Sequence, residues 1–327
     1  MNFIKYNKNE VIKERDKLAK IQANFLELFG VNDIFSNSKV YEVVIANELK
    51  HELIKGHSGS RDAFDKYGEY EYKHFKETSS NHSWTFNDFS DTTMEKLNNC
   101  KSVIFAHIDD IIYPPKLDWY YNVSGTTMST YLKEKTQAIK NTRKMINVSA
   151  NQIETCLDIK KTYNTDTNLV GQYYDMLKII FDSIKELEKL TFSKGLLTSN
   201  KIFELLTAVE LGHNMESEQG GRAGAHDAYD QDGNIYEYKI SKNYSWNFQD
   251  ISDNVLNKYL LDNEIILAVK NPEKLEIIEI YSAKPENTIP RLKEKLAIKK
   301  LKHGTLRRLQ VSLSRGDLKV IKATKIL

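Results

Sequence analysis

The alternation of hydrophobic and polar residues predicts the same order of elements twice along the chain. Apolar residues recur at helical spacing in an amphipathic helix expected over residues 9–29, and again over residues 168–190. A shorter helix is expected near residues 39–53 and 201–213, and each is followed by a loop, a hairpin and further strands. Because helices and strands are interspersed in this way, we expect an α+β fold with a mixed sheet.

The repeat can also be followed residue by residue. The segment "SKVYEVVIANELKHEL" (38–53) parallels "NKIFELLTAVELGHNM" (200–215), and the parallel continues in the same order through both halves. Long-period similarity of this kind indicates a duplicated domain. We therefore expect two similar domains, residues 1–163 and 164–327, that form an internal pseudo-dimer, with their boundary near "TYNTDTN" (162–168).

The composition is that of an ordinary globular protein, with 40% hydrophobic and 28% charged residues among 327. No apolar run approaches the roughly 18 residues that a membrane helix needs, and the first residues lack the apolar core of an export signal. The two cysteines, Cys100 and Cys156, form neither a disulfide framework nor a zinc pattern. We therefore expect a cytoplasmic protein with reduced thiols and no membrane partner.

The net charge of +2 does not by itself indicate a nucleic-acid binder, but the charge is unevenly distributed. Between Arg291 and Lys325 the chain has twelve Lys or Arg residues and two acids, Glu294 and Asp317. A basic stripe of this kind can meet phosphates. An excess of lysine on a solvent-exposed helix face gives the same pattern, so charge alone leaves both interpretations open.

Each predicted hairpin places acids and a lysine among tyrosines. The two strings are "DAFDKYGEYEYK" (62–73) and "DAYDQDGNIYEYK" (227–239). Because side chains alternate along a strand, the tyrosines of "YEYK" face one side, and the glutamate and lysine face the other. Gly68 in the first string and Asp232–Gly233 in the second predict the turn, which folds the leading aspartate back toward the glutamate.

Two carboxylates that converge with an amine can hold a divalent cation. Hard oxygen ligands favour Mg²⁺, which uses one or two protein carboxylates together with phosphate oxygens. Such an ion eases the deprotonation of water and neutralises charge on a phosphate, so the pattern predicts phosphodiester hydrolysis. A surface Glu–Lys ladder explains one copy as well, but both repeats keep these residues while their neighbours differ. The expected sets are Asp62, Glu71 and Lys73, and Asp227, Glu237 and Lys239.

These motifs resemble the PD-(D/E)xK nuclease superfamily, and more closely the PvuII-type restriction endonucleases. The string "RDAFDKYGEYEYK" is similar to the family motif N-D-A-x-D-x-x-G-x-E-Y-E-x-K, and "FGVNDIF" (29–35) resembles the segment that enters that fold. The resemblance spans most of each repeat and is looser at the end of the chain. It implies a restriction-endonuclease-like core in which the aspartate and glutamate hold Mg²⁺, with Mn²⁺ as a substitute, and the lysine serves the attacking water.

The resemblance also implies an assembly and partners. Enzymes of this family are homodimers in which each subunit cuts one strand, so this chain resembles such a dimer fused into one polypeptide. It would act as a monomer with internal two-fold pseudo-symmetry, and the leading helix of each repeat would build the contact between copies. The implied partners are double-stranded DNA and a cognate DNA methyltransferase in a bacterial cytoplasm.

The segments after the two lysines are where the family reads the DNA bases. The family's histidines are missing there, and this chain has "SWTFNDFSD" and "SWNFQDISD" instead. An amide can pair with adenine and a carboxylate can accept from cytosine, whereas Asp88 and Asp250 also suit the cap of a following helix. The candidates for base contact are Asn87, Asp88, Gln249, Asp250 and His82, and those for phosphate contact include Lys133, Lys293, Arg307 and Arg308. The aromatic residues nearby, Trp84, Phe86, Trp246 and Phe248, are expected in the core.

Two further pairs of acids occupy equivalent helix positions, Glu42 with Glu204 and Glu48 with Glu210. In related nucleases a helix acid sometimes assists the metal, and a surface glutamate is the alternative. The sequence thus predicts a sequence-specific, magnesium-dependent type II restriction endonuclease. Two other functions stay open: a repair, mobile-element or modification-dependent DNA nuclease with the same sites, and a non-catalytic DNA-binding module.

Overall fold

The computed structural model describes residues 3–55, 61–86, 90–137, 145–165, 170–216, 226–304 and 309–327. The chain forms two compact units. The first-repeat unit comprises Asn24–Ile34 and Ser38–Phe181, and the second-repeat unit comprises Met1–Ala23, Phe35–Asn37 and Asp182–Leu327. Helix α1 (Lys8–Phe29) and helix α6 (Tyr174–Thr191) therefore each contribute residues to both units.

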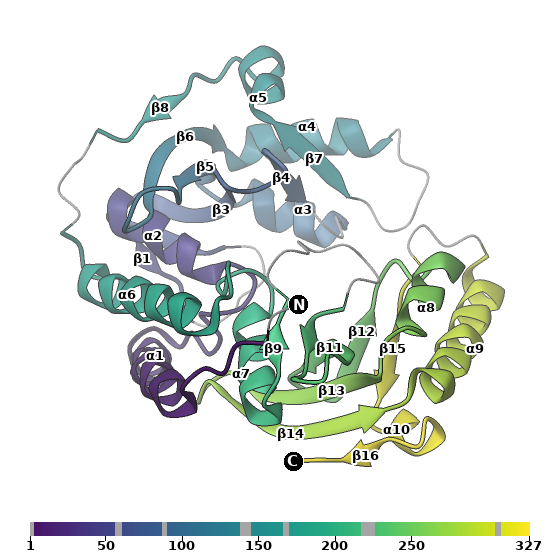
Figure 1. Ribbon diagram of the computed structural model, residues 1–327. Coiled ribbons are helices and arrows are strands. Elements are labelled where there is room, and N and C mark those ends of the chain that lie inside the picture. Colours follow the sequence, from purple (N-terminus) through teal and green to yellow (C-terminus); the bar gives the residue numbers. More distant parts are fainter. Residues whose placement is uncertain are drawn as a thin grey trace. The chain divides into compact units, whose positions relative to one another are not determined.

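In the first-repeat unit, the described residues build a six-stranded mixed sheet with the order β1-β2-β3-β5-β6-β8. Strands β3 and β5 are parallel, and the other neighbours are antiparallel. Helix α2 covers one face, and α3 and α4 cover the other, where the strands β4 and β7 pair beside them (Figure 1). The strands are β1 (Glu52–Leu53), β2 (Ala63–Asp65), β3 (Gly68–Lys76), β4 (Ser83–Phe86), β5 (Ser102–Asp109), β6 (Lys116–Ser124), β7 (Ile146–Ser149) and β8 (Thr162–Tyr163). The helices are α2 (Lys39–Leu49), α3 (Asp91–Asn98), α4 (Gly125–Gln137) and α5 (Ala150–Cys156).

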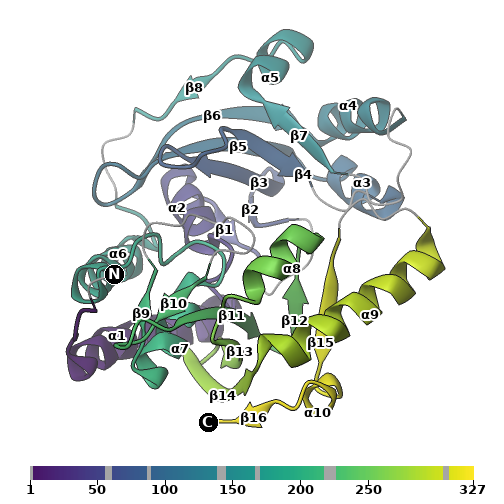
Figure 2. The same ribbon diagram turned by 45° about the vertical axis from the view of Figure 1, so that its right-hand side comes forward.

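The second-repeat unit has a similar plan in its described part, with a six-stranded sheet in the order β16-β14-β13-β11-β10-β9. Again only the central pair, β11 and β13, is parallel. Helix α7 covers one face, and α8 and α9 cover the other (Figure 2). The strands are β9 (Asn214–Met215), β10 (Ala228–Tyr229), β11 (Ile235–Ser241), β12 (Ser245–Phe248), β13 (Glu264–Asn271), β14 (Glu276–Ala283), β15 (Val311–Ser314) and β16 (Thr324–Lys325). The helices are α7 (Lys201–Leu211), α8 (Asp253–Tyr259), α9 (Pro285–His303) and α10 (Asp317–Val320).

The predicted α+β class is confirmed, with two similar mixed sheets, and the long leading helix of the first repeat lies where it was expected. The short helices were predicted too long at their C-terminal ends. Helix α2 stops at Leu49 because Lys50 adopts the left-handed conformation, at φ 58°, and α7 stops before Gly212, at φ 73°. The chain then enters a short edge strand in both units. Helix α6 begins at Tyr174 rather than at residue 168.

Each compact unit also includes residues that precede a leading helix of the other repeat. In the second-repeat unit, Tyr6 Oη donates a hydrogen bond to the His213 carbonyl at 2.8 Å. In the first-repeat unit, Tyr173 Oη accepts one from Leu53 N at 2.9 Å. Each compact unit thus includes the residues that lead into the other repeat. The limits 1–163 and 164–327 refer to the sequence repeats and stay a prediction.

The two aromatic pairs that follow the hairpins lie in the core, as predicted. Trp84 and Trp246 are fully buried, and their Nε1 atoms donate to the carbonyl oxygens of Ala106 at 3.0 Å and Ala268 at 2.9 Å. Phe86 and Phe248 lie in the same two clusters. These rings hold β4 and β12 against the main sheets. None of the described helices is both long and apolar enough to cross a membrane.

Candidate active sites

The first hairpin brings together the three residues that the sequence predicts. Asp62 lies just before β2, and its backbone N donates to the Tyr70 carbonyl at 2.8 Å, which sets it opposite the start of "YEYK". Its Oδ2 atom accepts a hydrogen bond from Tyr72 N at 2.7 Å. Lys73 forms an ion pair with Glu71, and its Nζ donates to the Tyr72 carbonyl at 3.3 Å. The turn and the alternation therefore position the set as expected.

The second hairpin builds the same arrangement from its own residues. Asp227 N donates to the Tyr236 carbonyl at 2.8 Å, and Asp227 Oδ2 accepts from Tyr238 N at 2.8 Å. Lys239 pairs with Glu237 and donates to the Tyr238 carbonyl at 3.1 Å. The two sets match bond for bond, although the turns that connect their strands differ in length.

One carboxylate oxygen in each site lacks a donor. Glu71 is 9% exposed and Glu237 is 3% exposed, and the Oε2 atom of each is buried without a hydrogen-bond partner in the described part of the chain. A buried anionic oxygen left without a partner is costly. A bound cation would supply the missing partner, so the donor set of each site fits a hard divalent ion.

Burial and neighbouring charge shift the pKa values of these groups. Burial raises the pKa of Glu71, and it raises the pKa of Glu237 to about 8, while the paired lysines act in the opposite direction. Burial works to lower the pKa of Lys73 and Lys239, but the adjacent carboxylates outweigh it and raise both values. The lysines therefore stay protonated at neutral pH.

A helix acid joins each set. The side chain of Glu42 on α2 is 18% exposed and pairs with Lys39, whose Nζ lies 3.4 Å from Asp62 Oδ1. Burial, then the charge of the nearby aspartate, raises the pKa of Glu42 to about 8, and Glu204 on α7 responds in the same way to Asp227. Both acids lie beside the sites, so the interpretation of Glu42 and Glu204 as surface glutamates is wrong.

The two carboxylates of each hairpin are the residues that could hold a metal ion. Over the described ranges, no group of three or more His, Cys, Asp or Glu side chains has the arrangement of a metal site. Mg²⁺ does not need one, because it keeps several waters and takes further oxygens from a phosphate substrate. The protein ligands would therefore be Asp62 with Glu71, and Asp227 with Glu237.

Two histidines that the sequence reasoning missed support the tyrosine face of each hairpin. His51 Nδ1 lies 2.7 Å from Tyr72 Oη, and His213 Nδ1 lies 2.8 Å from Tyr238 Oη. Each imidazole also stacks on the other tyrosine of its "YEYK" at 4.1 Å between ring centroids. Burial lowers the pKa of both histidines. Their matching positions in "ELKHEL" and "ELGHNM" were the signal that could have revealed them.

An acid near the second site was also missed. Asp262, which lies between α8 and β13, is 7% exposed, and burial followed by the charge of Asp227 raises its pKa to about 7. The first repeat has Cys100 at the equivalent place, before β5. The signal was the alignment of "NNCKSVIF" with "LLDNEIIL", where the two repeats differ in charge.

The structure describes only part of the predicted base-reading segments, since Asn87 and Asp88 lie outside the described residues. Gln249 and Asp250 are exposed between β12 and α8. The cap of α8 is Ser252, whose side chain accepts from Val255 N, so the capping alternative for Asp250 is wrong. Exposure leaves both Gln249 and Asp250 accessible to a partner.

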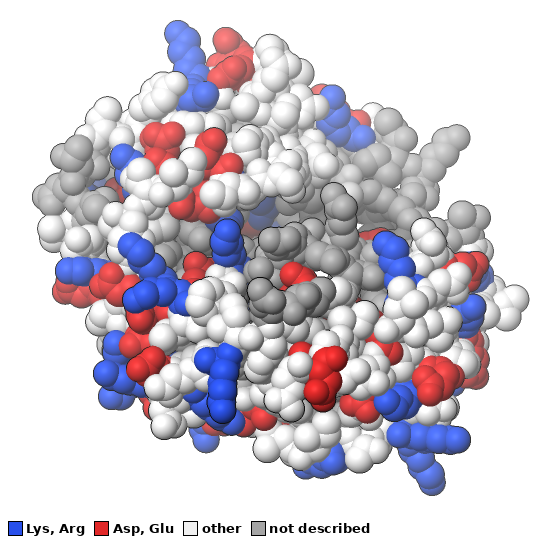
Figure 3. Space-filling model, in the orientation of Figure 1, with Lys and Arg blue, Asp and Glu red and all other residues white. Residues whose placement is uncertain are grey.

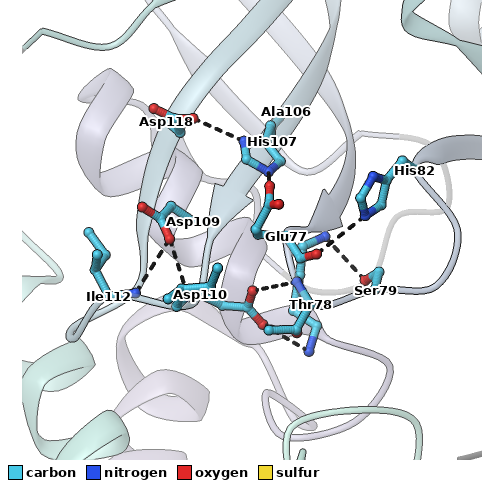
Figure 4. A network of polar contacts seen from close by, with 12 residues as sticks. Glu77, Thr78, Ser79, His82, Ala106, His107, Asp109, Asp110, Ile112 and Asp118 are labelled. Atoms are coloured by element: carbon cyan, nitrogen blue, oxygen red, sulfur yellow. Dashed lines mark hydrogen bonds and ion pairs between the residues drawn. The ribbon is translucent and has the colours of Figure 1, made fainter.

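His82 follows β3 in the first repeat, and its side chain is exposed. Its Nε2 lies 3.2 Å from the Glu77 carbonyl, and its ring stacks on Phe75 at 5.2 Å (Figure 4). In the same network His107 lies between two carboxylates, with Nε2 2.9 Å from Glu77 Oε2 and Nδ1 3.2 Å from Asp118 Oδ2. His82 is thus held against its own hairpin while one face of its ring stays open.

The basic segment at the end of the chain is partly engaged within the protein. The buried carboxylate of Asp317 accepts from Arg291 Nε at 2.7 Å and from Lys295 Nζ at 2.5 Å. Lys133 and Lys293 are exposed, and Lys293 lies 3.9 Å from Asp253. Arg307 and Arg308 lie outside the described residues. On the face drawn in Figure 3, basic and acidic side chains are interspersed. Because Arg291 and Lys295 both bind Asp317, they are better explained by the fold than by phosphate binding.

Comparison with known proteins adds no relative to this picture. Neither a protein-family model nor a curated protein sequence matches the chain. The function of the chain is therefore inferred from the chemistry of the two sites and from the presence of the same residue set in both repeats.

Proposed function

We propose that the chain is a magnesium-dependent type II restriction endonuclease with a restriction-endonuclease-like core in each repeat. It would act as a single-chain pseudo-dimer that hydrolyses both strands of duplex DNA, one strand at each site. The observation that carries this proposal is the pair of matching hairpins, each with an aspartate, a glutamate with an unpartnered buried oxygen, and a lysine. The resemblance of "RDAFDKYGEYEYK" to the PvuII-type motif supports the same conclusion.

The roles follow from the charges and contacts of the side chains. Asp62 and Glu71 would hold Mg²⁺ or Mn²⁺ in the first site, and Asp227 and Glu237 in the second. A bound divalent ion supplies charge neutralisation at the phosphate and acidifies water. The protonated lysine, held by the glutamate and by a backbone carbonyl, orients the attacking water or stabilises the charge that develops on the phosphate.

DNA recognition would use side chains near these sites. Exposed Gln249 and Asp250 are available for base contact, and exposed Lys133 and Lys293 for phosphates. Because phosphate contacts release counterions, the affinity for DNA would fall as the salt concentration rises. A cytoplasmic location and a cognate DNA methyltransferase belong to the same proposal.

The test is cleavage of plasmid DNA by the full chain with Mg²⁺, with Mn²⁺ and with EDTA, followed by sequencing of the product ends. We expect cleavage that requires the metal, with ends that share one short sequence and a constant stagger. Methylated, unmodified and branched DNA run in parallel identify a modification-dependent or repair nuclease if cleavage follows modification or structure instead. Binding without cleavage under every metal condition would contradict the proposal and indicate a DNA-binding module.

A further inference from the structure

The two candidate sites differ by one buried carboxylate. Asp262 lies directly before β13, the strand that pairs in parallel with β11, and the next residue, Asn263, donates its backbone N to the Ile235 carbonyl at 2.7 Å. This bond fixes the Asp262 backbone at the end of β11 that leads to Glu237. The side chain is 7% exposed, and among the described residues it has electrostatic neighbours, Asp227 and Lys239, but no hydrogen-bond donor.

The first repeat places a neutral side chain in the same backbone position. Lys101 N donates to the Glu69 carbonyl at 2.7 Å, as Asn263 does in the other repeat, and Cys100 precedes it. The Cys100 thiol is 5% exposed and donates to the Lys96 carbonyl at 3.5 Å. Burial raises the pKa of Cys100 to about 11, so the thiol is uncharged at neutral pH. The backbone is shared, and only the charge differs.

The lysines on α2 and α7 increase the difference in charge. In the first site, Lys39 pairs with Glu42 and lies 3.4 Å from Asp62. The equivalent lysine of the second repeat, Lys201, donates instead to the Lys194 carbonyl at 3.5 Å. The second site therefore has one more carboxylate than the first, and its helix lysine acts on Glu204 and Asp227 through its charge rather than through an ion pair among the described residues.

The two sites share a feature that calls for a ligand. The Oε2 atoms of Glu71 and Glu237 are both buried without a hydrogen-bond partner in the described structure, although Glu237 also has Lys239 and the Tyr259 hydroxyl as neighbours. A cation would supply the partner that each Oε2 atom lacks. In the second site the added charge of Asp262 would also attract that cation.

We propose that Asp262 is a positioning residue that makes the second site the tighter of two divalent-cation sites. This inference rests on the proposed nuclease function, which assigns a divalent cation to each site. Because the described residues contain no three-ligand group, Asp262 acts from outside the ligand set, through its charge and through the water that hydrates the ion. Losing such an outer partner typically weakens metal affinity by about 10–100-fold, so we expect a difference of that size between the sites.

The experiment measures Mn²⁺ binding to the full chain without DNA, by the loss of the free-ion electron paramagnetic resonance signal. Asp62→Asn removes a ligand of the first site and leaves the second to be measured, and Asp227→Asn does the reverse. We expect the Asp62→Asn chain to bind Mn²⁺ about 10–100-fold more tightly than the Asp227→Asn chain. A metal Kd is a readout that a purely structural role of Asp262 would not change.

Reciprocal variants then test Asp262 itself. In the Asp62→Asn chain, adding Asp262→Asn or Asp262→Cys should raise the Mn²⁺ Kd by about 10–100-fold, and the cysteine reproduces the residue of the first repeat. In the Asp227→Asn chain, adding Cys100→Asp should lower the Kd by about tenfold or more. Thermal melting of each variant reports whether it folds, and if the Asp262 variants do not fold, the Cys100→Asp result decides.

The outcomes separate this inference from the function on which it rests. If the Asp262 and Cys100 variants leave the Kd unchanged within about twofold, while Asp62→Asn and Asp227→Asn each remove one ion, the role of Asp262 is wrong and the two metal sites stand. If neither Asp62→Asn nor Asp227→Asn alters Mn²⁺ binding, the metal assignment of the proposed function fails as well.

Discussion

In the first-repeat unit two lysines, Lys39 and Lys73, form ion pairs with the acids of the candidate site, whereas in the second candidate site, among the described residues, Lys239 is the lysine in such a pair. The second site also has one more acid, Asp262. The hydrogen bonds that place the aspartate and the lysine beside the glutamate are nevertheless the same in both candidate sites. The backbone of the hairpin is therefore independent of the charge balance around it, and a duplicated site can change its electrostatics without changing its framework.

The difference arises at positions that the hairpin does not constrain. The residue before β5 or β13 needs only to be buried and to leave the next backbone N free to donate a hydrogen bond to the neighbouring strand. Cys100 and Asp262 both satisfy this requirement, and Leu97 and Tyr259 fill the preceding turn in the two repeats. Substitution there is compatible with the fold, so this is where two copies can diverge in function.

The largest expected effect tests whether the two sites work independently. Lys73→Ala or Lys239→Ala should each lower cleavage of one strand by about 10²–10⁴-fold, because a positioned proton-transfer or charge-stabilising group typically contributes that much. Each variant should therefore convert supercoiled plasmid to the nicked circle and leave little linear product. Gel electrophoresis over time measures the two products.

Strand mapping completes this comparison. The two variants should nick opposite strands of the same site, and the double variant should cut neither. If either single variant makes linear DNA at the full rate, the two sites do not serve one strand each. Lys274→Ala is a matched control that removes an exposed lysine with no assigned role in DNA binding, and it should leave the ratio of nicked to linear product unchanged.

The positions of the two Asp–Glu–Lys sets could be predicted because short-range interactions determine them. The turn at Asp232–Gly233 and the alternation in "YEYK" are local, and they bring Asp227 back beside the "YEYK" strand without help from the rest of the chain. The same holds for the first string. The sequence therefore specifies the framework of each site in about a dozen residues.

Features that depend on distant contacts could not be predicted in the same way. Nothing near Arg291 or Lys295 indicates that Asp317, more than twenty residues later, neutralises both. Nothing near Tyr6 indicates that it docks on His213. Composition counts charges but does not show which of them are paired, and this is why the basic segment looked more available for DNA than its described part is.

The second prediction concerns pH in the absence of metal. The pKa values of Glu42, Glu204 and Glu237 are raised to about 8, and that of Asp262 to about 7. Between the ordinary carboxyl pKa and these values the folded chain binds more protons than the unfolded chain, so its stability falls as the pH rises. The lysines add no slope here, because they are protonated in both states. Burial lowers the pKa values of His51, His74 and His213, which gives the opposite slope until these side chains are neutral in both states. Urea unfolding in EDTA should therefore show a loss on the order of a few kcal/mol from about pH 7.5 to pH 9.

Single-acid variants sharpen this measurement. Glu237→Gln and Glu42→Gln should each flatten the pH dependence by a similar amount, because burial raises both pKa values to about 8 and each carboxylate pairs with a lysine. Saturating Mg²⁺ should restore stability at pH 9. A stability that is flat or rising over this range in EDTA would mean that the buried acids ionise in the folded chain without cost.

A third prediction compares how the two repeats hold the short helix near their ends. Asp317, the first residue of α10, accepts from Ser314 N at 2.7 Å and forms ion pairs with Arg291 and Lys295, whereas Gln152, in the first turn of α5, makes a neutral capping box with Ser149. Asp317→Ala should cost about 2–3 kcal/mol of unfolding free energy, since it removes charged hydrogen bonds from a buried group. Gln152→Ala should cost about 1 kcal/mol. Equal losses in urea unfolding would show that the charges of the Asp317 network add nothing.

The smallest expected effect lies where the repeats are most alike. Trp84 and Trp246 donate the same hydrogen bond to a strand carbonyl, at 3.0 and 2.9 Å, and both rings are fully buried. Trp84→Phe and Trp246→Phe each remove that hydrogen bond and part of a buried ring, at a cost of about 1–3 kcal/mol. Because the environments match, the two losses of unfolding free energy should agree within about 0.5 kcal/mol. A larger disagreement in urea unfolding would show that the divergence seen around Asp262 extends into the core, and that the two units no longer share one packing scheme.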